Sequence, residues 1–171
     1  MIFVVYFVHI MNEYMPAPNE ELLNYQTTRL QNLIGEMLQC CEDRKLFQSQ
    51  KFELPYSELK CLMLFNGERY LTVKGIAQRL EVAKSRVTKI IDGLINKRLV
   101  RRIDDPDDGR IKLISLTPIG EEKSREIEAF QREIHQNILL NMDTDERKTV
   151  LSNLELLRSA MEAVKEQWGE K

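Results

Sequence analysis

The stretch between residues 72 and 117 constrains the fold of this chain most, because the spacing of its apolar residues changes halfway along. In the first half, apolar residues recur every three or four positions, as in amphipathic helices. Two short runs rich in β-branched residues follow, 99–103 and 111–116, as in strands. The loop between these runs contains Pro106 and Gly109, which favour a turn. We therefore expect helices followed by a β-hairpin.

The helical half divides into two helices at a tight turn, Glu81-Val82. The first helix follows Thr72, a residue suited to cap a helix N-terminus. The second runs from about Ala83 to Lys97. Its apolar stripe consists of Val87, Ile90, Ile91, Leu94 and Ile95, and we assign the first four of these residues to the core. Helix, turn, helix and hairpin in this order predict a winged helix-turn-helix. In such a fold the second helix fits the major groove of DNA.

Long helices are expected on both sides of this region. Only 7 Gly and 5 Pro occur in 171 residues, which argues against an all-β fold. The segment 19–50 has apolar residues at heptad-like spacings. Thr117 and Pro118 form a typical helix start, and Asp143 with Glu146 resembles a capping box that begins the last helix. The expected fold class is therefore mainly α with a small β-hairpin.

The last helix carries an apolar seam that no later segment is left to cover. Its apolar residues from Val150 to Trp168 follow one another at spacings of four and three, the a/d pattern of helices that pack against helices. We therefore expect a homodimer whose dimerisation helices come from segments 19–50 and 118–168. The residues expected at the dimer interface are Leu23, Leu30, Ile127, Phe130, Val150, Leu154, Leu157 and Met161.

Charge is unevenly distributed along the chain. The net charge is only −2, but residues 69–112 carry 12 Lys and Arg against 6 Asp and Glu, and both flanks are acidic. A basic middle between acidic arms indicates a polyanion partner, although a solvated basic face is the alternative explanation. Polar and basic residues gather at the start of the second helix. The residues expected to contact DNA there are Lys84, Ser85, Arg86, Thr88 and Lys89.

The run LTVKGIAQRLEVAKSRVTKIIDGLINKRLVRRIDDPDDGRIKLISLTPIGEE resembles the MarR/SlyA family of bacterial transcription regulators. Its most specific part is the wing, Asp105-Pro106-Asp107-Asp108-Gly109-Arg110, followed by Leu116-Thr117 and Gly120. The resemblance implies a MarR-type winged helix domain over residues 19–168, preceded by an apolar N-terminal arm, 1–18. Within that domain it implies these parts: a winged DNA-binding core at 55–117, the helix-turn-helix at 72–97 and the wing at 99–117.

The resemblance also implies the function. Members of this family regulate transcription as homodimers, so we expect a sequence-specific repressor on double-stranded DNA with a palindromic operator. Asp108 is expected to orient Arg110 at the wing tip for insertion into a minor groove. A small, often aromatic effector is expected to bind between the winged core and the dimerisation helices and to release DNA. No cofactor is expected.

Three positions depart from the family pattern. Ala83 stands where many members have a capping residue at the start of the second helix, and an alanine side chain cannot cap. Glu81 stands in the turn where Gly is frequent, so a positive φ there would be strained. Gly109 replaces a second Arg of the wing. We interpret these departures as changes in DNA affinity rather than loss of DNA binding.

Two other functions stay open at this point. A winged helix can serve as a protein-interaction module without specific DNA. Alternatively, Cys40 or Cys41 in the first long helix could act as a redox sensor, which requires an accessible thiol with a lowered pKa. Cys61 lies among apolar residues and is expected to be buried.

Catalysis, metal binding and membrane insertion are not expected. The chain has no catalytic signature and no CxxC, and His9 and His135 lack metal-ligand spacing. The apolar residues 1–11 are fewer than the roughly 20 that a membrane helix needs, and no basic residue precedes them. We therefore expect a cytoplasmic protein that does not contact membranes and is not an enzyme.

Overall fold

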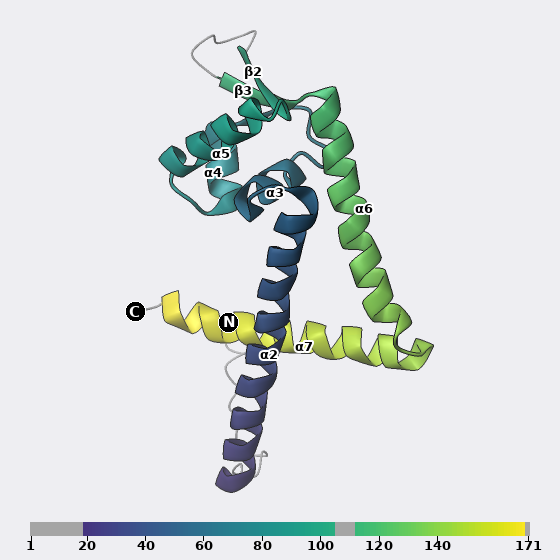
Figure 1. Ribbon diagram of the computed structural model, residues 1–171. Helices are drawn as coiled ribbons and strands as arrows, with labels where there is room; N and C mark the ends of the chain where they lie inside the picture. The colour runs from purple at the N-terminus through teal and green to yellow at the C-terminus, as the bar shows by residue number, and fades with distance from the viewer. Residues whose placement is uncertain (1–18, 105–111, 170–171) are drawn as a thin grey trace, which may run out of the picture. The chain divides into compact units, whose positions relative to one another are not determined.

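The structure, a computed structural model, describes residues 19–104 and 112–169 (Figure 1). The chain divides into two compact units after Tyr56. The first unit contains the helix α2 (Glu20–Phe52). The remaining elements are, in order, α3 (Tyr56–Met63), β1 (Leu71–Thr72), α4 (Val73–Leu80), α5 (Lys84–Asn96), β2 (Val100–Asp104), β3 (Lys112–Leu116), α6 (Pro118–Leu140) and α7 (Thr144–Gly169).

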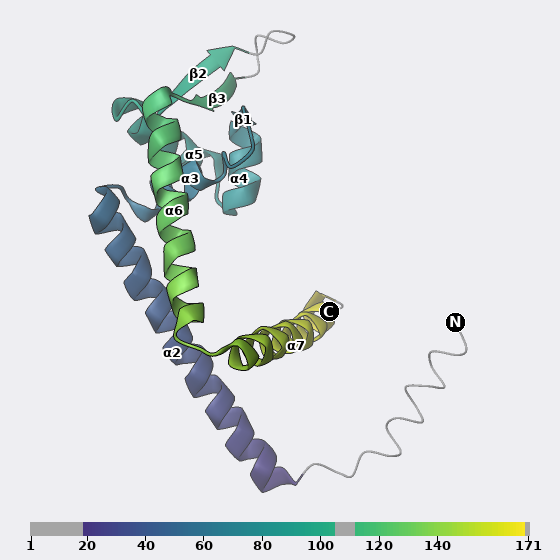
Figure 2. The same cartoon turned by 90° about the vertical axis from the view of Figure 1, so that its right-hand side faces the viewer.

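Helices α3, α4 and α5 gather beside a three-stranded antiparallel sheet, and α6 follows directly from β3 (Figures 1 and 2). The strand order is β1-β3-β2, with Ile114 of β3 paired to Arg102 on one side and to Leu71 on the other. The mainly α fold with a winged helix-turn-helix is therefore confirmed. Strand β1 is an addition, because its two residues are too few to show a strand period in the sequence.

The core of this second unit forms from the apolar faces of its helices and sheet. Val87, Ile90, Ile91 and Leu94 of α5 are all buried, as predicted from their helical spacing. The largest fully buried side chains of the other elements are Leu59, Leu62, Ile76, Ile114 and Ile127. Burying one face of α5 leaves the opposite face of the same helix exposed to solvent.

Side chains cap three helices at the predicted positions. The Thr72 hydroxyl accepts a hydrogen bond from the Gly75 N–H at 3.0 Å at the start of α4. At the start of α7, the Asp143 N–H donates to Glu146 at 2.8 Å and the Glu146 N–H donates to Asp143 at 2.9 Å, a complete capping box. The third cap, Thr117, begins α6. Each of these caps satisfies backbone N–H groups that the helix itself leaves unpaired.

The turn between α4 and α5 contains a strained residue. Glu81 has φ 55° and ψ 43°, the left-handed conformation that favours glycine. Its N–H nevertheless bonds back to the carbonyls of Ala77 and Gln78, which ends α4 and redirects the chain into α5. The positive φ considered for Glu81 from the sequence is therefore present.

A close backbone approach joins α6 to the end of α5 and the start of β2. The Thr117 N–H donates to the Leu99 carbonyl oxygen at 3.0 Å, and the Thr117 hydroxyl donates to the Arg98 carbonyl oxygen at 2.6 Å. A β-carbon on Gly120 would overlap with the Leu99 carbonyl oxygen. Glycine at this position therefore allows the first turn of α6 to pack directly against the chain that leaves α5.

A buried carboxylate also holds the C-terminal end of α5 against α3. Glu58 of α3 is only 6% exposed, and the Lys97 Nζ donates to both of its oxygens, at 3.1 and 2.9 Å. A β-carbon on Gly93 of α5 would overlap with the Glu58 carboxylate. Because a carboxylate out of water needs a charged partner, the Lys97 ion pair is what allows Glu58 to occupy this position.

Within the residues that the structure describes, no helix is long and apolar enough to cross a membrane.

Gly93→Ala should destabilise the protein by roughly 1–3 kcal/mol, because the new methyl group forces Glu58 away from Lys97. Gly35→Ala in α2 is the matched control, since a β-carbon there meets nothing within 4 Å and alanine favours the helix. Denaturant unfolding of both variants measures the difference. A Gly93→Ala protein as stable as the parent would contradict this account of α5.

Candidate nucleic-acid interface

The exposed face of α5 presents the residues that the sequence predicts to contact DNA. Lys84, Ser85, Arg86, Thr88 and Lys89 are all exposed, and they occupy the first six positions of this 13-residue helix together with the buried Val87. The N-terminal half of α5 is therefore basic on its solvent side and apolar on its core side. This is the arrangement that inserts a recognition helix into a major groove with its first residues against base edges.

The basic side chains of this face have no bonded partner within the described part of the chain. Neither Lys84, Arg86 nor Lys89 forms an ion pair or a side-chain hydrogen bond with a described residue. The Thr88 hydroxyl donates to the Lys84 carbonyl oxygen at 3.1 Å and so keeps its lone pairs for an external donor. These side chains can therefore meet phosphates and bases without first breaking an internal ion pair.

The start of α5 lacks a side-chain cap, as predicted. Ala83 is the N-cap residue, and among the described residues no side chain accepts from the first N–H groups of the helix. An uncapped helix N-terminus has unpaired backbone donors and a partial positive charge. The departure at Ala83 therefore lowers the intrinsic stability of α5 but adds to the positive potential of its basic end.

The two arginines of β2 have different environments. Arg102 donates to Asp92 of α5 at 2.6 Å, which links β2 to the exposed side of the recognition helix. Arg101 projects from the opposite face of the sheet, because successive residues of a strand alternate between faces. Lys112 and Asp104 form an ion pair across the two strands at the base of the wing. The two wing residues predicted to act on DNA, Asp108 and Arg110, lie outside the described residues.

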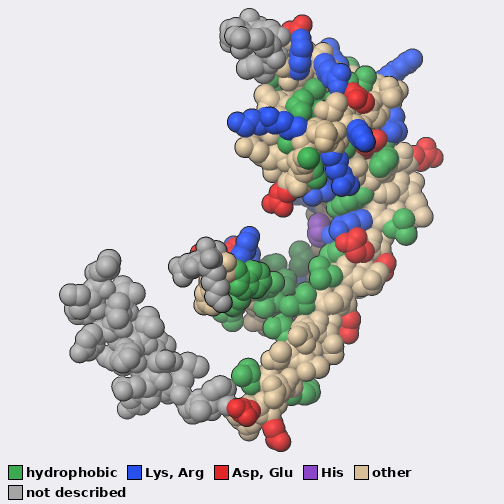
Figure 3. Space-filling model, turned by 90° about the vertical axis from the view of Figure 1, so that its left-hand side faces the viewer, with side chains coloured by type: hydrophobic (Ala, Val, Ile, Leu, Met, Phe, Trp, Pro, Cys, Tyr) green, Lys and Arg blue, Asp and Glu red, His purple; other side chains and the backbone are tan. Residues whose placement is uncertain are grey.

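Basic side chains are concentrated on the winged part of the molecule. In Figure 3, Lys and Arg (blue) surround the region of the sheet and of α4 and α5, whereas hydrophobic side chains (green) reach the surface of the long helices. The uneven charge of the sequence thus corresponds to an uneven charge of the folded surface. A local positive field of this kind attracts a polyanion even when the net charge of the protein is close to zero.

Most residues predicted at a dimer interface are exposed in the single chain. Leu23, Leu30, Val150, Leu154 and Met161 are exposed apolar residues of α2 and α7, and Phe130 and Leu157 are partly buried. Ile127 was wrongly included, since it is only 1% exposed and belongs to the core of its own chain. Its helical spacing with Phe130 did not reveal which face of α6 packs inward.

The three cysteines differ in accessibility. Cys61 is buried in α3, and desolvation together with the nearby Glu58 charge raises the pKa of its thiol to about 12. Its thiolate is therefore negligible at neutral pH, and the buried position predicted for it is confirmed. Cys40 is exposed and Cys41 is half-buried on α2. Among the described residues, no cluster of three His, Cys, Asp or Glu side chains could hold a metal ion.

Known proteins similar to this chain are DNA-binding regulators. The model of the MarR family matches residues 53–111. The HTH-type transcriptional regulator TcaR of Staphylococcus aureus is 31% identical over 110 residues, which cover 63% of this chain and 72% of TcaR. Because the identity extends over most of the length of TcaR, this chain and TcaR belong to the same family.

Solved structures show the same fold. The YusO protein of Bacillus subtilis superimposes with a TM-score of 0.66 at 26% identity, covering 84% of this chain and 99% of YusO. A mutant of MepR from S. aureus, solved bound to an oligodeoxyribonucleotide, has a TM-score of 0.59 at 19% identity and covers 77% of this chain and 97% of MepR. The chain, with its exposed basic recognition helix beside a winged sheet, thus belongs to the MarR family of winged-helix, DNA-binding transcription regulators, which are not enzymes.

Proposed function

We propose that this regulator is a homodimeric repressor that recognises a palindromic operator and responds to a small ligand. The observation that carries the proposal is the division of α5 into a buried apolar face and an exposed basic N-terminal half. Basic side chains on phosphates supply most of the affinity for DNA, and those that reach base edges supply specificity. A function on DNA also agrees with the cytoplasmic location expected from the sequence.

The apolar residues at the surface of the long helices support a homodimer. Leu154 is 46% exposed, and the other seam residues of α7 are also largely exposed, apart from Leu157. A row of exposed apolar residues at a/d spacings is stable in water only if another helix covers it. We propose that the dimerisation helices of a second copy provide this cover. Two-fold symmetry of the protein then requires two matching half-sites in the operator.

We propose that Arg110 enters a minor groove at the wing tip, held by Asp108. The short hairpin β2–β3 supports this role because its last described residue pair, Asp104 and Lys112, is exposed to solvent. The MepR mutant whose structure contains an oligodeoxyribonucleotide shares this fold. A narrow minor groove has a strongly negative potential, so an inserted arginine would report on groove width and thus on sequence.

A ligand response would act through the dimer. We propose that an effector binds one arrangement of the two recognition helices better than the arrangement that fits DNA. The effector then shifts the population away from the DNA-binding state. The size of this shift is limited by the difference between the effector's binding free energies for the two arrangements. The family relationship supports this mode of regulation, and it supports a small aromatic molecule as the effector.

Two substitutions should separate phosphate contact from sequence recognition. Lys89→Ala should weaken binding to an operator and to a scrambled duplex alike and should reduce the salt slope by about one unit. Arg110→Ala should cost roughly 1–3 kcal/mol on the operator, most on A·T-rich flanks, with little change in thermal stability. Salt-titrated binding to both duplexes measures these effects.

Arg125→Ala is the control for these DNA measurements, because Arg125 is exposed on α6, outside the proposed interface. We expect it to bind like the parent chain. If Arg110→Ala binds the operator as tightly as the parent, then the wing does not contribute to recognition. If Lys89→Ala leaves binding and its salt slope unchanged, then the exposed face of α5 is not the DNA interface.

The dimer is tested by adding charge to the α7 seam. Leu154→Asp together with Leu157→Asp should convert the dimer to a monomer, because two carboxylates would be buried without partners. Ser152→Asp together with Ser159→Asp adds the same charge on the opposite side of α7 and should leave the dimer intact. Sedimentation at micromolar concentration distinguishes the species. A monomeric parent chain, or a seam variant that still dimerises, would refute the proposed assembly.

A further inference from the structure

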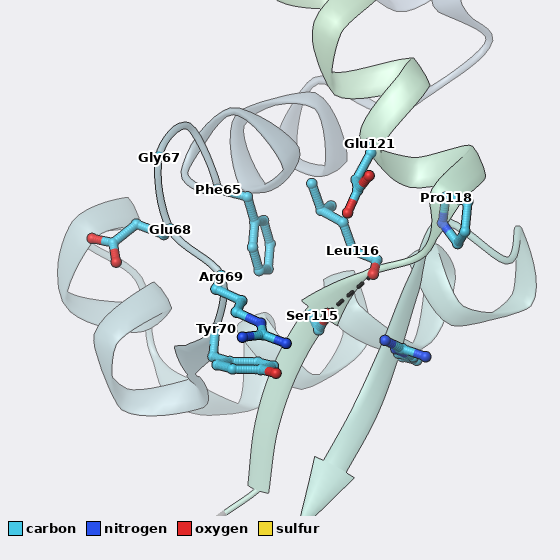
Figure 4. A pocket seen from close by; sticks show the side chains of 10 residues that line it. Phe65, Gly67, Glu68, Arg69, Tyr70, Ser115, Leu116, Pro118 and Glu121 are labelled. Carbon is cyan, nitrogen blue, oxygen red and sulfur yellow. Dashed lines mark hydrogen bonds between the residues drawn. The ribbon is translucent and has the colours of Figure 1, made fainter.

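The turn before the recognition helix carries a carboxylate that no described residue binds. Glu81 is exposed, and its side chain forms no ion pair or hydrogen bond with a residue that the structure describes. By contrast, the exposed Glu68, drawn in Figure 4, pairs with Arg79 at 2.7 Å. The Glu81 carboxylate is therefore available to act on a molecule that approaches the start of α5.

Position 81 is an unfavourable place for a glutamate. Its backbone has φ 55° and ψ 43°, a conformation that glycine adopts without strain and glutamate does not. The backbone N–H ends α4 whichever side chain the residue has, since it bonds to the Ala77 and Gln78 carbonyl oxygens. The turn therefore does not require the glutamate side chain, and a role for this side chain must come from its carboxylate.

The carboxylate belongs to the basic end of α5. Glu81 is three residues before Lys84, so their Cα atoms are at most about 11 Å apart, three steps of about 3.8 Å. Charges act over about 8 Å at physiological salt, which is a similar distance. The N-cap residue Ala83 provides no side-chain acceptor, so the helix start has free backbone donors and a partial positive charge. In the protein without DNA, this end of α5 attracts the Glu81 carboxylate.

DNA reverses the effect of this charge. The exposed Lys84, Arg86 and Lys89 of the same half of α5 are the basic side chains that we assign to phosphates and bases. The carboxylate repels a phosphate that approaches them, and the two anions compete for the positive end of the helix. A charge that is favourable in the free protein and unfavourable in the complex lowers the affinity for DNA in both ways.

We propose that Glu81 is an internal competitor of DNA phosphates and weakens the sequence-independent part of DNA binding. This part of the affinity comes almost entirely from phosphates, so a nearby anion lowers it on every duplex. Weaker binding to arbitrary DNA leaves more of the regulator free to reach its operator among many competing sites. The inference rests on the assignment of α5 to DNA in the proposed function, and it adds a residue that opposes binding to those that favour it.

The test compares Glu81→Gln and Glu81→Gly with the parent chain on a duplex of scrambled sequence. Glu81→Gln removes the charge and keeps the length of the side chain, so it should tighten binding about 2- to 5-fold, a gain that shrinks as salt is raised. Glu81→Gly should tighten binding by the same factor and raise the thermal midpoint by roughly 2–4 °C, because it also removes the strain. Fluorescence anisotropy at several salt concentrations and thermal unfolding measure these effects.

Glu53 provides a matched control. It is an exposed glutamate in the same left-handed conformation, φ 55° and ψ 36°, directly after α2. Its carboxylate likewise has no ion pair with a described residue. Glu53→Gln changes the net charge equally, and Glu53→Gly relieves the same kind of strain. Both variants should bind the duplex like the parent chain, because position 53 belongs neither to α5 nor to the turn before it.

Several results would overturn the inference. Glu81→Gln could bind like the parent, or Glu53→Gln could tighten binding equally, which would show an effect of net charge alone. Tightening by Glu81→Gly without tightening by Glu81→Gln would show that strain, not charge, opposes DNA. Weaker binding of Glu81→Gln to a selected operator would show that the carboxylate accepts a bond from a base.

Lys89→Ala separates a failure of this inference from a failure of the proposed function. If Lys89→Ala weakens binding while Glu81→Gln leaves it unchanged, then the interface stands and only the role of Glu81 is wrong. If both variants bind like the parent, then α5 is not the DNA interface and both proposals are wrong.

Discussion

The backbone at Leu99 joins the end of the recognition helix α5 to the start of α6, and the arrangement of the winged-helix region depends on this contact. The Leu99 N–H donates to the Leu94 carbonyl oxygen at 2.9 Å, which ends α5, and the Leu99 carbonyl accepts from the Thr117 N–H at 3.0 Å. Only a glycine at position 120 lets α6 approach this carbonyl so closely. The recognition helix, the base of the wing and the start of α6 therefore meet at one junction. Close packing at this junction leaves little room for α6 to move independently of the recognition helix.

The recognition helix is held at its C-terminal end by two different physical means. Backbone hydrogen bonds and close packing fix its exit at Leu99, while the Glu58–Lys97 ion pair fixes its last turns to α3. Its N-terminus has neither a side-chain cap nor an ion pair among the described residues, and it follows the strained Glu81. The half of α5 that we assign to DNA is thus the half with the fewest internal bonds, as expected where binding energy is reserved for an external partner.

Features set by local interactions could be predicted from the sequence. The apolar stripe of α5, the caps at Thr72 and Thr117 and the capping box at Asp143 involve residues within a few positions of one another. Features set by distant contacts could not. Glu58 and Lys97 are 39 residues apart, and the spacing of the apolar residues in α3 does not indicate that Glu58 is buried. The pocket lined by Phe65, Ser115 and Glu121 likewise depends on segments that are distant in the sequence and meet only in the fold (Figure 4).

Selection of genomic DNA fragments by the full-length protein tests the central claim most directly, because it requires the recognition helix, the wing and the dimer to act together. We predict enrichment of one motif with two-fold symmetry, whose half-sites are centred about one helical turn, roughly 10 bp, apart. Binding should fall steeply as salt is raised. Enrichment of a single unrepeated half-site would contradict the dimer. Recovery of fragments with no shared motif would contradict sequence-specific regulation.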